Sequence, residues 1–226
     1  TAGVLDLEHT AGVIADLDVD VIGLQEVDRY WSERSAFTDQ AAFLAERLAM
    51  QMVFGASLDR AGRTDAHPRR QYGNALLSRF PVLDARSTLL PRRRTSEQRT
   101  LLEVRIVVGD VPLRCLNTQW QHRSGTARMA QAEATTAKVD DRDDPTVLVG
   151  DLNAGPDTPE VRTLTEHLAD VWPTRGEGDG YTYGAQAPRR RIDYVLASPD
   201  IDVRHACVTP TKASDHLPVT ADLRLS

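Results

Sequence analysis

The chain has 226 residues, of which 41% are hydrophobic and 27% charged, and its formal net charge is −6. Such a chain is long enough for one large α/β domain or two small ones, its hydrophobic content is normal for a globular protein, and we expect a single sizeable core. The acidic balance excludes a protein that holds duplex nucleic acid mainly through a broad basic surface. No run of about 18 apolar residues occurs, so we expect a soluble protein without a membrane span, either cytoplasmic or secreted.

Apolar periodicity predicts helices interspersed among more numerous strands. In chain order these are a helix over 5–17, a buried strand over 19–24, a helix from Thr38 or Asp39 to Met50 with Thr38 as its cap, strands over 52–56, 74–77 and 81–85, a hairpin over 101–108 and 111–116, a helix over 124–139, a strand over 146–149, a helix opening at 158–160, and strands over 192–197, 203–209 and 219–225. No linker or repeat divides this pattern, which favours one mixed-sheet α/β domain.

Two polar segments interrupt the pattern. Residues 58–72 are rich in Arg and contain Gly62 and Pro68, which predicts a long surface loop. Residues 91–94 form a second exposed basic stretch. The two cysteines, Cys115 and Cys207, lie in predicted strands and are expected to be buried free thiols.

The first candidate site residues are Asp151 and Asn153. They follow the apolar run 147–149, and the period of two places both on the same side of the strand end. A carboxylate that accepts a proton beside an amide that donates one suits the orientation of an attacking water at a phosphate. The alternative is an Asx turn in which both side chains bond only to nearby backbone.

Glu26 follows a buried strand and is expected at the rim of the sheet. Mg²⁺ prefers one or two protein carboxylates together with water and substrate oxygens, and Glu26 could supply one of them. A solvated acid at a strand end is the equally simple interpretation.

Asp193 lies inside the strand-like run 192–197, where an unpaired carboxylate would be costly. His216, which precedes the last predicted strand, is the expected partner. A carboxylate on one imidazole nitrogen fixes the tautomer and leaves the other nitrogen free to act on water or phosphate. Asp215 can then serve a metal ion.

These segments together resemble the endonuclease/exonuclease/phosphatase superfamily, and the resemblance runs from about residue 5 to residue 225. It is carried, in the family's order, by Leu24-Gln25-Glu26-Val27, Tyr72-Gly73-Asn74-Ala75-Leu76-Leu77-Ser78-Arg79, Asn117-Thr118, Gly150-Asp151-Leu152-Asn153, Arg191-Ile192-Asp193-Tyr194 and Ser214-Asp215-His216-Leu217-Pro218. Each string alone is weak, whereas the ordered set is specific.

The resemblance implies a four-layered α/β sandwich, with two packed mixed β-sheets flanked by helices, and a Mg²⁺-dependent attack of water on a phosphate ester. Mn²⁺ is expected to substitute for Mg²⁺. The resemblance also implies that Glu26 and Asp215 bind the metal and that Asp151 and Asn153 orient the nucleophile and the phosphate. Asp193 is expected to support His216, which acts as general base or as a phosphate-stabilising imidazole. The residues expected to bind substrate are Asn74, Asn117, Gln119 and Arg191.

The sequence departs from the family pattern in two ways. Family members usually begin with a strand that ends in a metal-binding Asn. We expect residues 1–226 to form a single domain without this first strand; either the strand was truncated or unobserved, or the protein lacks it. Many relatives have His where this chain has Gln119, and an amide can donate a hydrogen bond but cannot titrate. We expect Gln119→His to raise phosphodiesterase activity.

The expected substrate is a phosphate ester, with single-stranded or short nucleic acid among the candidates, and the expected state is a monomer. Loop arginines at 69, 70, 92–94, 189 and 190 could line a phosphate-binding rim or be solvated loop charges. A phosphodiesterase or nuclease is the first expectation. The alternatives are a phosphomonoesterase, a phospholipid-headgroup phosphodiesterase and a binding protein of the same fold with weakened catalysis.

Overall fold

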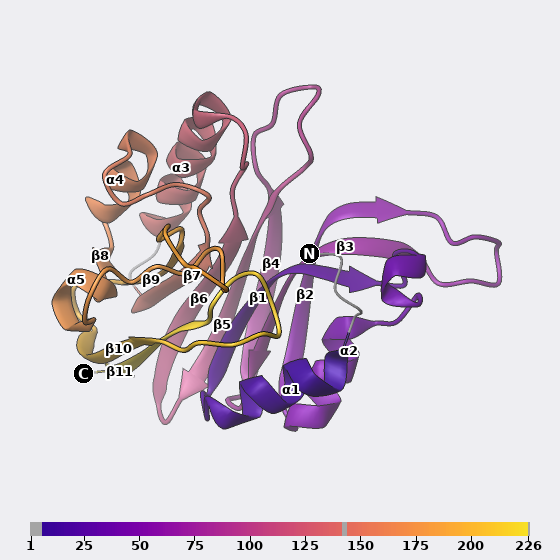
Figure 1. Ribbon diagram of the computed structural model, residues 1–226, viewed down its shortest axis with the longest axis horizontal. Helices are drawn as coiled ribbons and strands as arrows, with labels where there is room; N and C mark the ends of the chain where they lie inside the picture. Colours follow the sequence, from indigo (N-terminus) through magenta and orange to yellow (C-terminus); the bar gives the residue numbers. More distant parts are fainter. Residues whose placement is uncertain (1–5, 142–143, 226) are drawn as a thin grey trace.

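A computed structural model describes residues 6–141 and 144–225 of the chain (Figure 1). The helices are α1 (Leu7–Asp16), α2 (Gln40–Leu48), α3 (Gly125–Val139), α4 (Pro159–Thr165) and α5 (Val171–Arg175), with a short 3-10 helix at Glu33–Ser35. The strands are β1 (Val21–Arg29), β2 (Gln51–Arg60), β3 (Arg70–Ser78), β4 (Val82–Leu89), β5 (Thr100–Val108), β6 (Val111–Gln119), β7 (Thr146–Asp151), β8 (Ala169–Asp170), β9 (Asp193–Ala197), β10 (Asp202–Val208) and β11 (Val219–Arg224).

The strands form a large sheet that faces two smaller ones. The six-stranded sheet has the order β4-β5-β6-β7-β9-β8; its β6–β7 pair is parallel and its other pairs are antiparallel. Opposite it lie the antiparallel sheets β1-β3-β2 and β10-β11.

Side-chain alternation along the strands builds the layers. In β9, Val195 and Ala197 join the cluster between the sheets, whereas Tyr194 and Leu196 join the cluster beneath α3 and α4. The neighbouring residues Cys115 and Leu116 of β6 alternate in the same way: Cys115 joins the cluster between the sheets, and Leu116 joins the cluster beneath the helices. A strand buried on both faces reads as a continuous apolar run, which explains why these strands could be recognised from the sequence.

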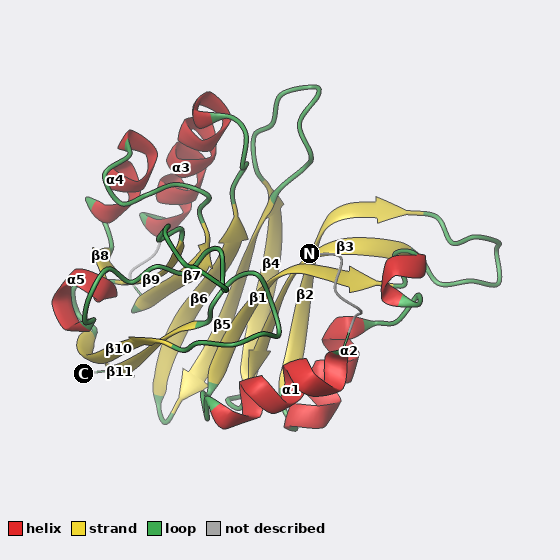
Figure 2. Ribbon diagram, in the orientation of Figure 1, coloured by secondary structure: helices red, strands yellow, loops and turns green. Residues whose placement is uncertain are grey.

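Helices cover both outer faces (Figure 2). Ala132 of α3 and Leu164 of α4 pack on the large sheet, and Ala11 of α1 and Leu44 of α2 pack on Leu77 of β3. The resulting order of helices, sheet, sheet and helices confirms the expected four-layered α/β sandwich. Among the described helices, none is both long and apolar enough to cross a bilayer. Both cysteines are free thiols; Cys115 is buried, as expected, whereas Cys207 is only half-buried.

Several predicted boundaries were wrong. The second helix is capped by Asp39, whose Oδ1 accepts a hydrogen bond from the Ala42 amide at 3.0 Å, and not by Thr38. The loop predicted over 58–72 spans only 61–69, because β2 and β3 extend into it as a paired ribbon of polar residues. Polar ribbons lack the apolar alternation that identifies a strand in sequence.

Candidate active site

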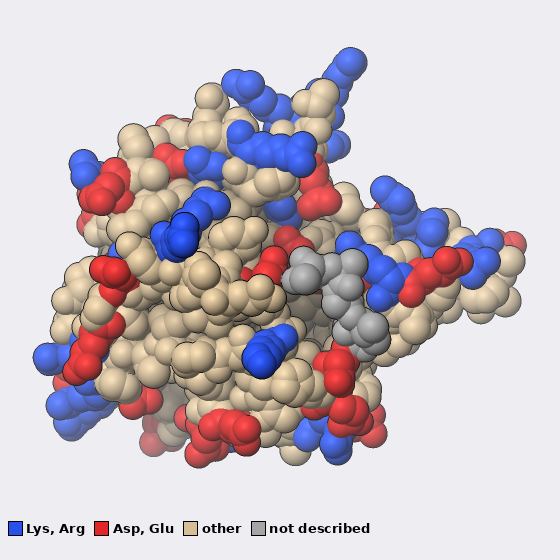
Figure 3. Space-filling model, viewed as in Figure 1, with Lys and Arg blue, Asp and Glu red and all other residues tan. Residues whose placement is uncertain are grey.

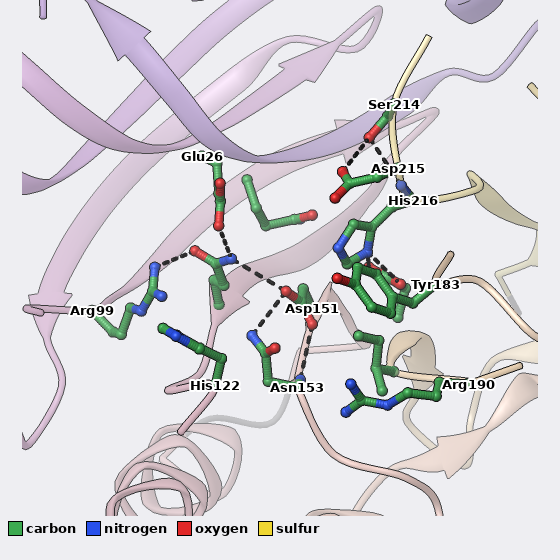
Figure 4. Close-up of a pocket in the computed structure, with 14 residues that line it drawn as sticks. Glu26, Arg99, His122, Asp151, Asn153, Tyr183, Arg190, Ser214, Asp215 and His216 are labelled. Carbon is green, nitrogen blue, oxygen red and sulfur yellow. Dashed lines mark hydrogen bonds and ion pairs between the residues drawn. The ribbon is translucent and has the colours of Figure 1, made fainter. Parts of the chain in front are cut away.

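A cleft of about 420 Å³ opens at the edge of the sandwich, near the ends of β6 and β7 and the start of β9 (Figure 4). It is lined by Gln25, Glu26, Arg99, Gln119, His122, Asp151, Asn153, Tyr183, Arg190, Ile192, Asp193, Ser214, Asp215 and His216. Glu26 and Asp215 enter from one side of the view, and Asp151 and Asn153 enter from the other. The cleft therefore gathers carboxylates that are far apart in the chain.

Glu26 reaches the cleft through a β-bulge inside β1, whereas the sequence analysis had expected it at the end of a strand. The register between β1 and β3 shifts between Leu24 and Val27, and Glu26 has a left-handed φ of 58°. Such a conformation costs a non-glycine residue on the order of 1 kcal/mol, and bulges redirect side chains next to functional sites. The bulge exposes the Glu26 side chain while β1 continues to Arg29.

Gln119 links the carboxylates of the two sheets. Its Nε2 donates hydrogen bonds to Glu26 Oε1 at 2.7 Å and to Asp151 Oδ2 at 3.2 Å. Its Oε1 accepts a hydrogen bond from Arg99 Nη1. Because guanidinium can only donate, Arg99 fixes the amide with its NH₂ group toward the two acids. Gln119 thus holds Glu26 of β1 and Asp151 of β7 at one place.

Asp151 and Asn153 form a hydrogen-bonded pair at the end of β7. The Asn153 amide donates to Asp151 Oδ1 at 2.9 Å, and Asn153 Nδ2 donates to Oδ2 at 2.9 Å. The predicted juxtaposition is confirmed, and it also contains the Asx-type turn that had been its alternative. Burial, together with the nearby charge of Asp193, raises the pKa of Asp151 to about 6; His216 and the hydrogen bonds oppose the rise.

Asp193 and His216 form the predicted pair. His216 Nδ1 lies 2.9 Å from Asp193 Oδ2 and 3.0 Å from Oδ1, and the Thr182 hydroxyl donates to Oδ2 at 2.5 Å. Burial disfavours the imidazolium, but the hydrogen bond and charge of Asp193, with the charges of Asp151 and Asp215, raise the pKa of His216 to about 9. The ring is therefore protonated at neutral pH and leaves Nε2 available as a donor.

Tyr183 orients the imidazole from its other side. The two rings lie 4.9 Å apart at 58°, and the Tyr183 and His216 backbones form an isolated β-bridge. The segment that carries His216 is therefore held by backbone pairing as well as by Asp193.

Three side chains of the cleft, those of Asp151, Asp193 and His216, have ligand atoms within 4.8 Å of one another and could hold a metal ion. His216 Nδ1, however, already makes a hydrogen bond to the Asp193 carboxylate. The Glu26 carboxylate is a harder metal ligand than an imidazole. It is exposed to the cleft, and only its Oε1 is hydrogen-bonded to Gln119. Carboxylate oxygens of this kind suit Mg²⁺ or Mn²⁺ better than softer metals.

Comparison with protein-family models decides the relationship: the Endonuclease/Exonuclease/phosphatase family model matches residues 2–216. The chain belongs to this family. Members of the endonuclease/exonuclease/phosphatase family hydrolyse phosphoric esters, and the chain is assigned to that enzyme class. A comparison with curated proteins found no match.

Solved structures agree with the family assignment. The chain is similar to an endonuclease/exonuclease/phosphatase from Beutenbergia cavernae, with 29% identity, a TM-score of 0.83, and 99% of this chain and 67% of that chain covered. The mannosyl-6-phosphatase Bt3783 from Bacteroides thetaiotaomicron has 17% identity and a TM-score of 0.76, covering 97% and 90% of the two chains. The human Nocturnin catalytic domain has 19% identity and a TM-score of 0.73, covering 97% and 86%. The latter two likenesses show the fold alone.

Three residues expected to bind substrate lie elsewhere. Asn74 and Asn117 are buried between the sheets: Asn74 Nδ2 donates to the Thr100 carbonyl at 3.0 Å, and Asn117 Nδ2 donates to the carbonyls of Leu24 and Ala75. Neither lines the cleft. Their amides bond to backbone carbonyls where the sheets meet, so the structure places them outside the cleft in which they had been expected to bind substrate.

Arg191 is also turned away from the cleft. Its Nη1 donates to Asp170 Oδ2 at 2.7 Å, and its guanidinium lies 4.8 Å from the Tyr194 ring centre. The preceding residue, Arg190, lines the cleft instead. The sequence did not reveal which of these two adjacent arginines faces the cleft, because a register shift of one residue moves a side chain to the opposite face.

Arg99, His122 and Tyr183 line the cleft, but the sequence analysis did not assign them to the site; Arg190, which it had considered for a phosphate-binding rim, lines the cleft as well. A signal did exist, because Arg99 directly precedes the buried strand β5 and His122 follows the end of β6 by three residues. Placement at strand ends near one sheet edge is the feature they share with Asp151.

Proposed function

We propose that this chain is a Mg²⁺-dependent phosphodiesterase in which water attacks a phosphodiester in the cleft. The observation that supports it best is the convergence of Glu26, Asp151 and the Asp193–His216 pair on one cleft, with Gln119 and Arg99 holding two of the acids in place. Mn²⁺ would substitute for Mg²⁺.

Glu26 and Asp215 would hold the metal ion, since both present carboxylates to the cleft. When bound, the ion supplies positive charge to the phosphate oxygens and to the attacking water. The protein's own task is then chiefly positioning and charge neutralisation, as in other phosphoryl transfers.

Asp151 would orient the attacking water through its carboxylate, which Asn153 keeps directed by two hydrogen bonds. The water oxygen bonds to phosphorus and gives a proton to the Asp151 carboxylate, the ester P–O bond breaks, and the leaving oxygen takes up a proton from solvent. His216 Nε2 would donate to a phosphate oxygen in this step, since Asp193 holds the Nδ1 side of the ring.

The basic loops favour a phosphate-rich substrate. Figure 3 shows Lys and Arg side chains around the margin of the face that contains the site. The loop of residues 90–99 carries three consecutive arginines, and Arg190 lies at the cleft itself. Short or single-stranded nucleic acid fits this distribution, with local contacts that an acidic protein can make.

A phosphomonoesterase is the second candidate. Arg99 and Arg190 both line the cleft and would favour the additional charge of a monoester dianion.

The test is hydrolysis of bis(4-nitrophenyl) phosphate and 4-nitrophenyl phosphate with Mg²⁺, Mn²⁺, Ca²⁺ or EDTA. We expect metal-dependent cleavage that favours the diester and is abolished by Asp151→Ala and His216→Ala. His9→Ala, on the exposed side of α1, is the matched control and should keep full activity. Preference for the monoester would establish the second candidate. Absence of cleavage with every metal, nucleic-acid oligomer and phospholipid tried would favour a binding protein.

A further inference from the structure

Three side chains from separate segments of the chain line the cleft beside one another: Arg190, Tyr183 and His216. Tyr183 forms isolated antiparallel β-bridges with both of the others, so the three backbones make a small patch of sheet with Tyr183 in the middle. Residues directly opposite one another in antiparallel pairing project from the same face. The three side chains therefore form a row, with His216 at one end and Arg190 at the other (Figure 4).

The fold fixes the spacing along this row. The Tyr183 amide donates to the Arg190 carbonyl at 3.0 Å, and the Leu217 amide donates to the Thr182 carbonyl at 2.7 Å. The Tyr183 and His216 rings lie 4.9 Å apart, and Arg190 Cζ lies 5.6 Å from the Tyr183 ring centre. Arg190 and His216 are thus two strand spacings apart, on the order of 10 Å between their backbones. A single ligand in the cleft can therefore contact both ends of the row.

The charge of Arg190 is available to such a ligand. Its side chain is exposed, and in the part of the chain that the structure describes no carboxylate forms an ion pair with it, although several acids line the same cleft. By contrast, Arg99 lies 3.0 Å from Glu97, and Arg191 lies 2.7 Å from Asp170. A guanidinium stays charged and carries N–H donors in a fork that matches phosphate. Arg190 thus differs from the other two arginines in keeping its charge and its donors for a ligand.

We propose that Arg190, supported by Tyr183, is a subsite for a second phosphate group of the substrate. The proposal depends on the proposed function, in which His216 contacts the phosphate that water attacks. Guanidinium groups bind phosphate through paired N–H···O bonds, and the row places this group at a distance from the first phosphate that one sugar unit can span. The substrate class is a phosphodiester whose next sugar position carries another phosphate, as in consecutive nucleotides of a strand.

Tyr183 has a defined part in this subsite. Its ring packs between the imidazole of His216 and the guanidinium of Arg190, so that the two groups contact different phosphates. A guanidinium is attracted to the face of an aromatic ring, and a side chain that is already placed loses less freedom when a ligand binds. The alternative is that Arg190 binds the same phosphate as His216, which would make it equally important for every phosphate ester. Dependence on a second phosphate distinguishes the two roles.

The test compares hydrolysis of thymidine 5′-(4-nitrophenyl phosphate) with and without a 3′-phosphate group, both of which release 4-nitrophenolate. The wild type should prefer the 3′-phosphorylated substrate by roughly tenfold in kcat/KM, mainly through a lower KM, as expected for charge-assisted hydrogen bonds to one phosphate. Arg190→Gln should remove most of this preference, and Arg190→Lys should keep part of it because the charge remains without the fork. No preference in the wild type would overturn the proposal.

A matched control separates the subsite from the general charge of the loop. Arg189→Gln removes the same charge from the adjacent residue, which is exposed and does not line the cleft. This variant should keep the wild-type preference. Loss of the preference in both variants would mean that long-range charge is responsible, and an equal loss of rate on the two substrates in Arg190→Gln would place Arg190 at the first phosphate. Either result would contradict the proposal.

Binding without catalysis distinguishes failure of the subsite from failure of the proposed function. In EDTA, calorimetry should give the wild type a Kd for thymidine 3′,5′-bisphosphate roughly tenfold below that for thymidine 5′-phosphate, and Arg190→Gln should bind the two alike. This result would support the subsite even if the chain cleaves neither nitrophenyl substrate. Cleavage of both substrates at equal rates, with equal affinities for the two nucleotides, would leave the proposed function in place and remove the subsite.

Discussion

Replacing Asp151 by Asn should abolish hydrolysis and yet stabilise the metal-free fold. Asp151 is only 4% exposed, and its carboxylate lies in the field of Asp193. Burial and this like charge raise its pKa from 3.8 to about 6. A group that binds its proton more tightly in the folded state contributes stability below its unfolded pKa, and this contribution is lost as the pH rises through the folded pKa.

The size of the effect follows from the shift. About two pKa units, at 1.36 kcal/mol each, correspond to about 3 kcal/mol that the ionised Asp151 costs the folded protein above pH 6. About 2 kcal/mol of this cost should develop between about pH 4 and about pH 6.5. An Asn side chain carries no charge, so the variant does not have this free-energy cost. The new amide side chain would place an NH₂ donor where a carboxylate oxygen had accepted from Asn153 or Gln119. The hydrogen bond lost in this way lowers stability by an amount that does not depend on pH.

The assay is urea unfolding in EDTA at these two pH values. The Asp151→Asn variant should gain about 2 kcal/mol relative to the wild type between the lower and the higher pH, equivalent to roughly 4–8 °C in Tm. His216, with a pKa of about 9, stays protonated in the folded state throughout this window. Asp157→Asn is the control, because that side chain is 94% exposed and the change should be nearly neutral. A stability difference for Asp151→Asn that is the same at both pH values would refute the reasoning.

Three further changes test the neighbouring contacts. Asp193→Asn should lower the pKa of His216 by at least about one unit, since it removes the carboxylate bonded to Nδ1, and NMR titration of the ring would show it; an unchanged pKa would mean that the other acids suffice. Gln119→His should raise phosphodiester turnover, because imidazole can protonate a leaving group and its second nitrogen can still accept from Arg99; a rate at or below wild type counts against this role. Gln119→Met should instead cost about 2–4 kcal/mol in thermal unfolding, as Glu26 and Asp151 lose their shared donor, and a loss under about 1 kcal/mol would show that the bridge matters little.

The sequence was most informative where burial imposes a period of two. The strands that became β5, β6, β7 and β9 carry apolar residues toward both the inter-sheet cluster and the helices, and this leaves an unmistakable run. Boundaries failed where polar side chains continue a strand, as in the ribbon of β2 and β3 that flanks residues 61–69. Pairing there depends on backbone hydrogen bonds, which any residue except proline can make.

The site shows the same division. Asp193 and His216 could be paired from the sequence because a carboxylate inside a strand needs a partner, and the structure places them 2.9 Å apart. The bulge at Glu26 could not be predicted, since a single inserted residue leaves no apolar signature. Nor could the exchange of roles between Arg190 and Arg191, which depends on register alone. Asn74 and Asn117, which belong to strings that carry the family resemblance, make hydrogen bonds to backbone carbonyls where the sheets meet.

The arrangement of charges explains why the site should couple stability to ligand binding. Glu26, Asp151, Asp193 and Asp215 share one cleft with His216, Arg99 and Arg190 as the cationic groups that line it. Gln119 keeps two of these acids together with a neutral amide, which satisfies their oxygens without cancelling their charge. Burial and the negative charge of Asp193 therefore raise the pKa of Asp151 in the metal-free protein, where the repulsion among the acids persists. A divalent cation at Glu26 and Asp215 would lower that repulsion, and the free energy so released adds to the affinity of the site for the ion.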